Sequence, residues 1–118
     1  MKATHRLVRH VPGVMNKTEL QYEKLLSDRK AQGDIIDYWF ECFTLKLGDQ
    51  CRYTPDFAVI TADLTLEFHE VKGARAIFKD DSKAKIRAAA NKFPFPFFVA
   101  FATKQGFEIE DFTRKVTE

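Results

Sequence analysis

The spacing of apolar positions along the chain changes from a helical period to a strand period near residue 34. Before that point, the apolar stripe at helical spacing consists of Tyr22, Leu25 and Leu26. Asn16 and Glu19 have the spacing of a capping box, and Gly33 is a typical helix stop. The pattern therefore predicts a helix from Asn16 to Gly33.

Three strands are predicted after this helix. Residues 35–47 are rich in β-branched and aromatic types and end at a turn signal, Gly48-Asp49. A second strand is expected from about Arg52 to Ile60, and a third, alternating one covers residues 64–73. We expect these three strands to form an antiparallel meander.

The second half of the chain predicts a helix and at least one more strand. Residues 79–92 combine three consecutive alanines with spaced lysines and arginines, which favours a helix. Residues 93–103 are expected to form a buried strand, and residues 107–112 a short strand or irregular tail. The order α-β-β-β-α-β predicts an α/β domain with a central mixed sheet flanked by helices.

Length and composition indicate one packed domain covering residues 1–118, with 45% hydrophobic residues and 12 Phe. We expect the basic segment 1–15 to be a flexible arm or a short strand. Trp39, Phe40 and the aromatic cluster 93–101 are expected in the core. The net charge of +2, two unpatterned cysteines and the lack of a long apolar run favour a cytoplasmic protein without a membrane partner.

Two acids and a lysine have the spacing of a chemical site. Asp56 and Glu70 lie on consecutive predicted strands, and their midpoint is Asp63, in the expected turn. A symmetric hairpin would place the two carboxylates opposite each other, with Cβ atoms about 5 Å apart. Lys72 is two residues beyond Glu70 and therefore points to the same face.

Opposed carboxylates destabilise a sheet unless a proton or a cation separates them. A hard divalent cation such as Mg²⁺ meets this requirement where phosphate is the substrate, with the Val71 carbonyl as a further ligand. Mg²⁺ would polarise the phosphate, and Lys72 would orient or deprotonate the attacking water. The alternative is a surface ion-pair cluster, but the apolar neighbours of Glu70 argue against it.

Pro55-Asp56 followed by Glu70-Val71-Lys72 resembles the motif of the PD-(D/E)XK nuclease superfamily. The order of elements is similar to that of small phage-encoded endonucleases, including the type that resolves Holliday junctions. The resemblance implies a restriction-endonuclease-like core and Mg²⁺-dependent hydrolysis of DNA to 5′-phosphate and 3′-hydroxyl ends, with Mn²⁺ as an expected substitute. Asp56 and Glu70 would be metal ligands and Lys72 the water-positioning residue.

A further acid on the preceding helix is implied by the same resemblance, and the segment from Asn16 to Glu19 looks like that element. Glu19 and Glu23 share one helical face. Glu19 projects nearer the apolar stripe and is the expected catalytic acid. The alternative is that Glu19 only completes the capping box with Asn16.

Basic residues on the second predicted helix suit contact with phosphates: Lys79, Lys83, Lys85 and Arg87. A solvated helix face would have the same pattern. His69 is expected on the opposite strand face from Glu70, as a core or surface histidine. In the N-terminal arm, His5 and His10 with the arginines beside them are equally compatible with DNA contact and with disorder.

Cutting both strands of DNA needs two sites, so the sequence and its resemblance predict a homodimeric endonuclease that binds DNA. Two other hypotheses remain open at this point. One is a DNA-binding module that keeps the fold without catalysis. The other is a protein-interaction domain, which a weak dependence of DNA binding on salt would favour.

Overall fold

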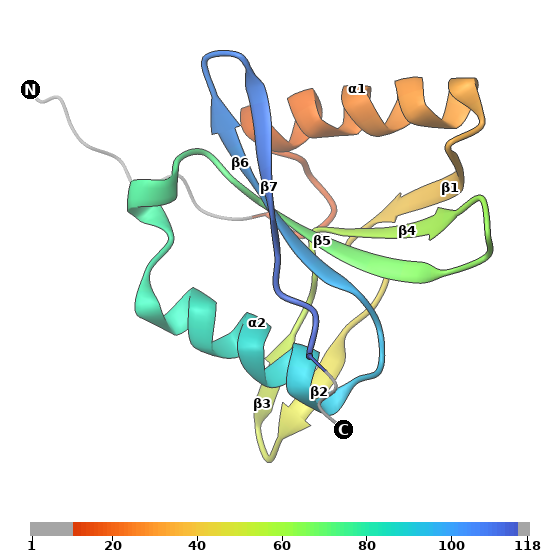
Figure 1. The fold of residues 1–118 in the computed structure, drawn as a ribbon. Coiled ribbons are helices and arrows are strands. Elements are labelled where there is room, and N and C mark those ends of the chain that lie inside the picture. Colours follow the sequence, from red (N-terminus) through yellow and green to blue (C-terminus); the bar gives the residue numbers. More distant parts are fainter. Residues whose placement is uncertain (1–10, 116–118) are drawn as a thin grey trace, which may run out of the picture.

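A five-stranded mixed sheet forms the centre of the computed structural model, which describes residues 11–115 (Figure 1). The strand order is β1-β4-β5-β6-β7, in which only β5 and β6 are parallel neighbours. The strands are β1 (Ile35–Phe40), β4 (Phe57–Thr61), β5 (Leu66–Lys72), β6 (Phe97–Thr103) and β7 (Gly106–Asp111). The prediction of an α/β fold with a mixed sheet is confirmed.

Two helices flank this sheet, α1 (Lys17–Gln32) and α2 (Asp80–Lys92), and a short 3-10 helix covers Arg75–Ile77. Asn16 and Glu19 form the predicted capping box, and Gly33 ends α1 in the left-handed conformation with φ 86°. α2 is the crossover between the parallel strands β5 and β6. Both predicted helices are therefore present, with boundaries that differ by at most one residue.

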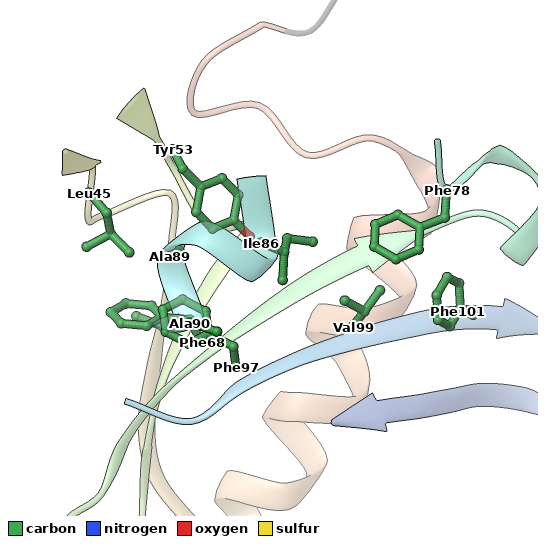
Figure 2. Close-up of a cluster of buried hydrophobic side chains, with 11 residues drawn as sticks. Leu45, Tyr53, Phe68, Phe78, Ile86, Ala89, Ala90, Phe97, Val99 and Phe101 are labelled. Atoms are coloured by element: carbon green, nitrogen blue, oxygen red, sulfur yellow. The ribbon is translucent and has the colours of Figure 1, made fainter. Parts of the chain in front are cut away.

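Each face of the sheet is covered by its own apolar layer. α1 packs on one face, in a cluster made of Tyr22, Leu26, Ile35, Phe57, Val59, Val71 and Ala100. On the other face, α2 and a separate hairpin of β2 (Leu45–Gly48) and β3 (Cys51–Tyr53) pack together over β4, β5 and β6 (Figure 2). β5 contributes to both layers because its side chains alternate between the two faces.

The β2–β3 hairpin corrects the predicted meander, in which residues 35–47 and 52–60 were each one strand. The first strand breaks after Phe40, where Glu41 has a left-handed φ of 50° and turns the chain out of the sheet. The second breaks at Pro55, which has no N–H to donate to a ladder. The observed order is α-β-β-β-β-β-α-β-β, because these breaks add two strands and the tail forms β7.

The hairpin of β4 and β5 has the predicted register. Phe57 pairs with His69 and Ile60 with Leu66, so the pairing is symmetric about Asp63. The next pair in this register would be Asp56 and Glu70. Asp56 lies one residue before β4, so the two acids meet where the ladder opens.

His69 lies on the expected face, that of α1 and opposite to Glu70, and it is buried, which selects the core from the two placements left open. Its Nδ1 is 2.6 Å from the Tyr22 hydroxyl, and its Nε2 is 2.8 Å from Glu67 Oε1. These two contacts connect Tyr22 on α1 to His69 and Glu67 on β5. Burial raises the pKa of the Tyr22 phenol far above its ordinary value, so this hydroxyl keeps its proton.

Other expectations have mixed outcomes. Trp39 is 42% exposed, which corrects its placement in the core: β1 is an edge strand, and the layer of α2 and the hairpin does not cover it. Phe40 and most of the aromatic cluster 93–101 are buried or half-buried.

Residues 1–10, with His5 and His10, lie outside the described residues. Across residues 11–115, none of the helices is both long and apolar enough to cross a membrane.

Candidate active site

A cavity of about 760 Å³ opens at the end of the sheet where β4 begins and β5 ends. Its lining includes all four residues predicted for catalysis: Glu19, Asp56, Glu70 and Lys72. The rest of the lining comes from the segment before α1, the loops around the β2–β3 hairpin and the 3-10 helix: Pro12, Gly13, Asn16, Phe40, Glu41, Thr44, Thr54, Val71, Gly73 and Ile77. The fold thus gathers side chains from both layers at one place.

Asp56 is held in place by the backbone at the open end of the β4–β5 ladder. Its side chain is buried, with 8% of the residue exposed, and Oδ2 accepts a 2.7 Å hydrogen bond from the Val71 N–H. Its own carbonyl accepts a 2.9 Å bond from the Glu41 N–H. Among the described residues, Asp56 Oδ1 has no hydrogen-bond partner, so this oxygen is available to a ligand in the cavity.

Glu70 points to the opposite sheet face from Val71 and meets the β2–β3 hairpin. Its side chain is 13% exposed, and Oε1 accepts a 2.7 Å hydrogen bond from the Tyr53 hydroxyl. Lys72 Nζ lies 3.6 Å from Glu70 Oε2 and 5.9 Å from the centre of the Phe78 ring. A phenol and an ammonium therefore hold the two oxygens of this carboxylate.

The electrostatics of this acid pair favour a bound proton or cation. Burial, and after it the negative charge of Glu70, raise the pKa of Asp56 to about 9 despite the Val71 hydrogen bond that lowers it. Burial also raises the pKa of Glu70, against the hydrogen bond from Tyr53 and the charge of Lys72. Without a cation, the pair therefore holds a proton at neutral pH.

Glu19 reaches the cavity from the first turn of α1. Only 5% of the residue is exposed, and its Oε1 accepts a 2.8 Å hydrogen bond from the Asn16 N–H as part of the capping box. Its charge also raises the pKa of Asp56. Glu19 therefore caps α1 and also lines the cavity. Glu23 is not part of the lining, and it accepts a 3.4 Å hydrogen bond from the Tyr38 hydroxyl.

The donor set fits a hard divalent cation in part. No group of three His, Cys, Asp or Glu side chains suited to a metal ion occurs within residues 11–115. Mg²⁺, however, typically uses one or two carboxylates and completes its shell with water and substrate phosphate. Asp56 and Glu70 supply the two carboxylates. The N–H and the carbonyl of one strand residue point toward the same neighbouring strand, so the Val71 carbonyl faces Asp56 as the Val71 N–H does.

Two residues that contact the site were not foreseen from the sequence. Tyr53 comes from β3 and is not part of the cavity lining, and nothing in the linear pattern places its hydroxyl at Glu70. Glu41 lines the cavity, where its Oε1 accepts a 2.7 Å bond from the Gly13 N–H. The proximity of these side chains depends on the chain leaving the sheet at Glu41, which no periodicity indicates.

The basic residues at and after the start of α2 are not part of the cavity lining. Lys83 Nζ is 5.5 Å from the centre of the Phe78 ring, the ring that Lys72 also approaches. The Arg87 guanidinium is 5.7 Å from the Phe112 ring. Lys79 and Lys85 are exposed. Of the four predicted phosphate contacts, Lys83 is the one that approaches the same ring as Lys72.

The site combines an open carboxylate pair, a lysine and a backbone carbonyl in a cavity that is wide enough for a phosphodiester. Such a set can bind a divalent cation, orient a water molecule and offset negative charge on a phosphate. The chain matches no protein-family model, and neither curated proteins nor solved structures give a significant match to it.

Proposed function

We propose that the protein is an Mg²⁺-dependent endonuclease that hydrolyses DNA to 5′-phosphate and 3′-hydroxyl ends. The observation that carries this proposal is the buried Asp56 next to the partly buried Glu70 and Lys72, in a cavity open to solvent. Burying two carboxylates with a single lysine costs free energy, and a bound cation would offset that cost. The motif position at the open end of a hairpin also supports a restriction-endonuclease-like core.

Each residue has a role that follows from its surroundings. Bound at Asp56, Glu70 and the Val71 carbonyl, Mg²⁺ would polarise the scissile phosphate and lower the pKa of an attacking water. Lys72 orients that water and offsets the charge that develops on the phosphate. Tyr53 and the Val71 N–H fix the two carboxylates, so the site needs little rearrangement when substrate arrives.

Cleavage assays test the proposal directly. Supercoiled plasmid and a four-way DNA junction would be incubated with the protein in Mg²⁺ or in chelator. We expect cleavage that needs the metal and falls at least about 100-fold in Asp56→Asn and in Lys72→Ala. Asp63→Asn, in the exposed turn of the same hairpin, and Lys24→Ala, on α1, are the matched controls.

The outcomes separate the candidate functions. Preference for the junction over the plasmid would assign a structure-specific nuclease. No cleavage with Mg²⁺ or Mn²⁺, together with salt-sensitive DNA binding, would replace the proposal with a non-catalytic DNA-binding module. The molar mass from light scattering tests whether the protein is a homodimer. A monomeric protein that cuts both DNA strands in one encounter would contradict the homodimer.

Glu19→Gln separates the catalytic role of this residue from its capping role. Glutamine keeps an oxygen that can accept the Asn16 bond, so the melting temperature should stay within about 2 °C. If the negative charge of Glu19 helps to hold the cation, the Mg²⁺ concentration that gives half-maximal cleavage should be about 10–100-fold higher for Glu19→Gln than for the wild type. Glu23→Gln is the control, and equal behaviour of the two variants would leave Glu19 with capping alone.

A further inference from the structure

The β2–β3 hairpin has two faces of opposite character. In its register Leu45 pairs with Tyr53 and Lys46 with Arg52. Leu45 and Tyr53 are buried in the layer that α2 shares (Figure 2). Lys46 and Arg52 are exposed on the other face, and the hairpin extends away from the central sheet (Figure 1). The outer face thus presents two positive charges directly opposite each other.

Like charges at directly opposed positions destabilise a two-stranded ribbon. Within residues 11–115, the side chains of Lys46 and Arg52 have no ion-pair or hydrogen-bond partner, although their backbones pair in the β2–β3 ladder. Arg75, another surface cation, binds Glu108 and Glu110, whereas exposed lysines such as Lys24 have no acidic partner among the described residues. What distinguishes Lys46 and Arg52 is that the two cations are directly opposed. The hairpin therefore keeps an unfavourable cationic pair that an anionic ligand would stabilise.

The same face continues into the candidate active site. Thr44 and Thr54 are the next opposed pair in this register, and their hydroxyl oxygens are 2.8 Å apart. Both threonines line the cavity that contains Asp56. Arg52 is four residues before Asp56, so the two residues are separated by at most about 13 Å of extended chain. The same length spans about four nucleotides along one strand of B-DNA.

We propose that the outer face of the β2–β3 hairpin binds the phosphodiester backbone of the substrate next to the scissile phosphate. Lys46 and Arg52 contact phosphates. Thr44 and Thr54 share one hydrogen bond, and the hydroxyl whose proton that bond does not use donates to a backbone oxygen at the cavity rim. This inference rests on the proposed nuclease function. It assigns phosphate contact to the hairpin, in addition to the α2 residues predicted from the sequence.

The test is a salt titration of binding in chelator, where no metal-dependent cleavage occurs. Fluorescence anisotropy of a labelled DNA duplex would compare wild type, Lys46→Gln, Arg52→Gln and the double variant. Each lost contact should reduce the slope of log affinity against log salt by about 0.9, and affinity at 0.1 M salt about fivefold to tenfold. An RNA duplex of the same sequence shows which backbone the face prefers.

Lys24→Gln is the matched control, because Lys24 is exposed on α1, across the sheet from the hairpin. Neutralising the opposed cations removes repulsion, so the melting temperature of the double variant should not fall. A double variant with the affinity and salt slope of Lys24→Gln would overturn the hairpin assignment while leaving the nuclease proposal intact. Wild type without salt-sensitive binding to either duplex would overturn both.

Discussion

The two carboxylates of the candidate site are held by donors from different parts of the fold. Asp56 accepts from the backbone of Val71 on β5, and Glu70 accepts from Tyr53 on β3. The sequence predicted that Asp56 lies opposite Glu70, from strand alternation and a symmetric hairpin, but it did not predict the hydrogen bond from Val71 to Asp56. The hydrogen bond from Tyr53 to Glu70 was not predicted either, because it depends on how the β2–β3 hairpin folds over the sheet.

Asp56 should make stability depend on pH. Its pKa is about 9 in the folded chain, whereas an unfolded aspartate titrates near about 4. Between these values the folded state binds the extra proton, so the free energy of unfolding falls as pH rises. The stabilisation by this proton is complete below about pH 4 and is lost toward pH 9. Between these values the free energy of unfolding falls by up to about 1.4 kcal/mol per pH unit.

Urea unfolding in chelator at several pH values between 5 and 8 measures this slope. Asp56→Asn keeps an oxygen for the Val71 bond and removes the titrating group, so the slope should become shallower. Asp28→Asn, exposed on α1, is the control. Added Mg²⁺ should also flatten the slope of the wild type. Parallel curves for wild type and Asp56→Asn would show that Asp56 is already ionised in the folded protein.

Tyr53→Phe tests how much the Glu70 carboxylate depends on its donor. Loss of this partly buried hydrogen bond to a carboxylate should lower the free energy of unfolding by about 1–2 kcal/mol. If Tyr53 positions Glu70 for the cation, the Mg²⁺ requirement should also rise, by about 10–100-fold. The control is Tyr38→Phe, which removes the 3.4 Å bond to Glu23 outside the cavity. A stability loss with an unchanged Mg²⁺ requirement would restrict Tyr53 to a structural role.

Among the elements, the helices were the most predictable because their ends have local chemical signals. The capping box and the left-handed Gly33 are both visible in the sequence. The strands were predicted in type but not in extent. Glu41 and Pro55 each break a run that its hydrophobic pattern alone would continue, and the broken pieces form the hairpin over α2.

Gly33→Ala tests the end of α1. Gly33 has φ 86°, and a Cβ there would have nothing within 4 Å, so the cost is conformational rather than steric. We expect a loss of about 1–2 kcal/mol in the free energy of unfolding. Gly48 also has open space around it and no positive φ, so Gly48→Ala should be neutral or stabilise by up to about 1 kcal/mol. Equal effects of the two substitutions in denaturant unfolding would contradict this account.

At the scale of the molecule, the cavity lies where the two apolar layers end. Glu19 arrives with α1 from one layer, and Glu70 points into the other, toward Tyr53. The sequence predicted both flanking helices and the crossover through α2. It did not predict the layer that the hairpin adds, because that layer depends on contacts between residues far apart in the chain.

The β4–β5 turn, residues 61–65, lies at the far end of the hairpin from Asp56 and Lys72. Ala62, exposed in this turn, is about 20 Å of extended chain from Asp56. A thiol-reactive dye on Ala62→Cys, in a chain whose free Cys42 and Cys51 are both replaced by serine, would therefore be connected to the cavity by the hairpin without entering it. Energy transfer from this dye to either end of a labelled duplex would measure the direction in which the nucleic acid lies across the protein.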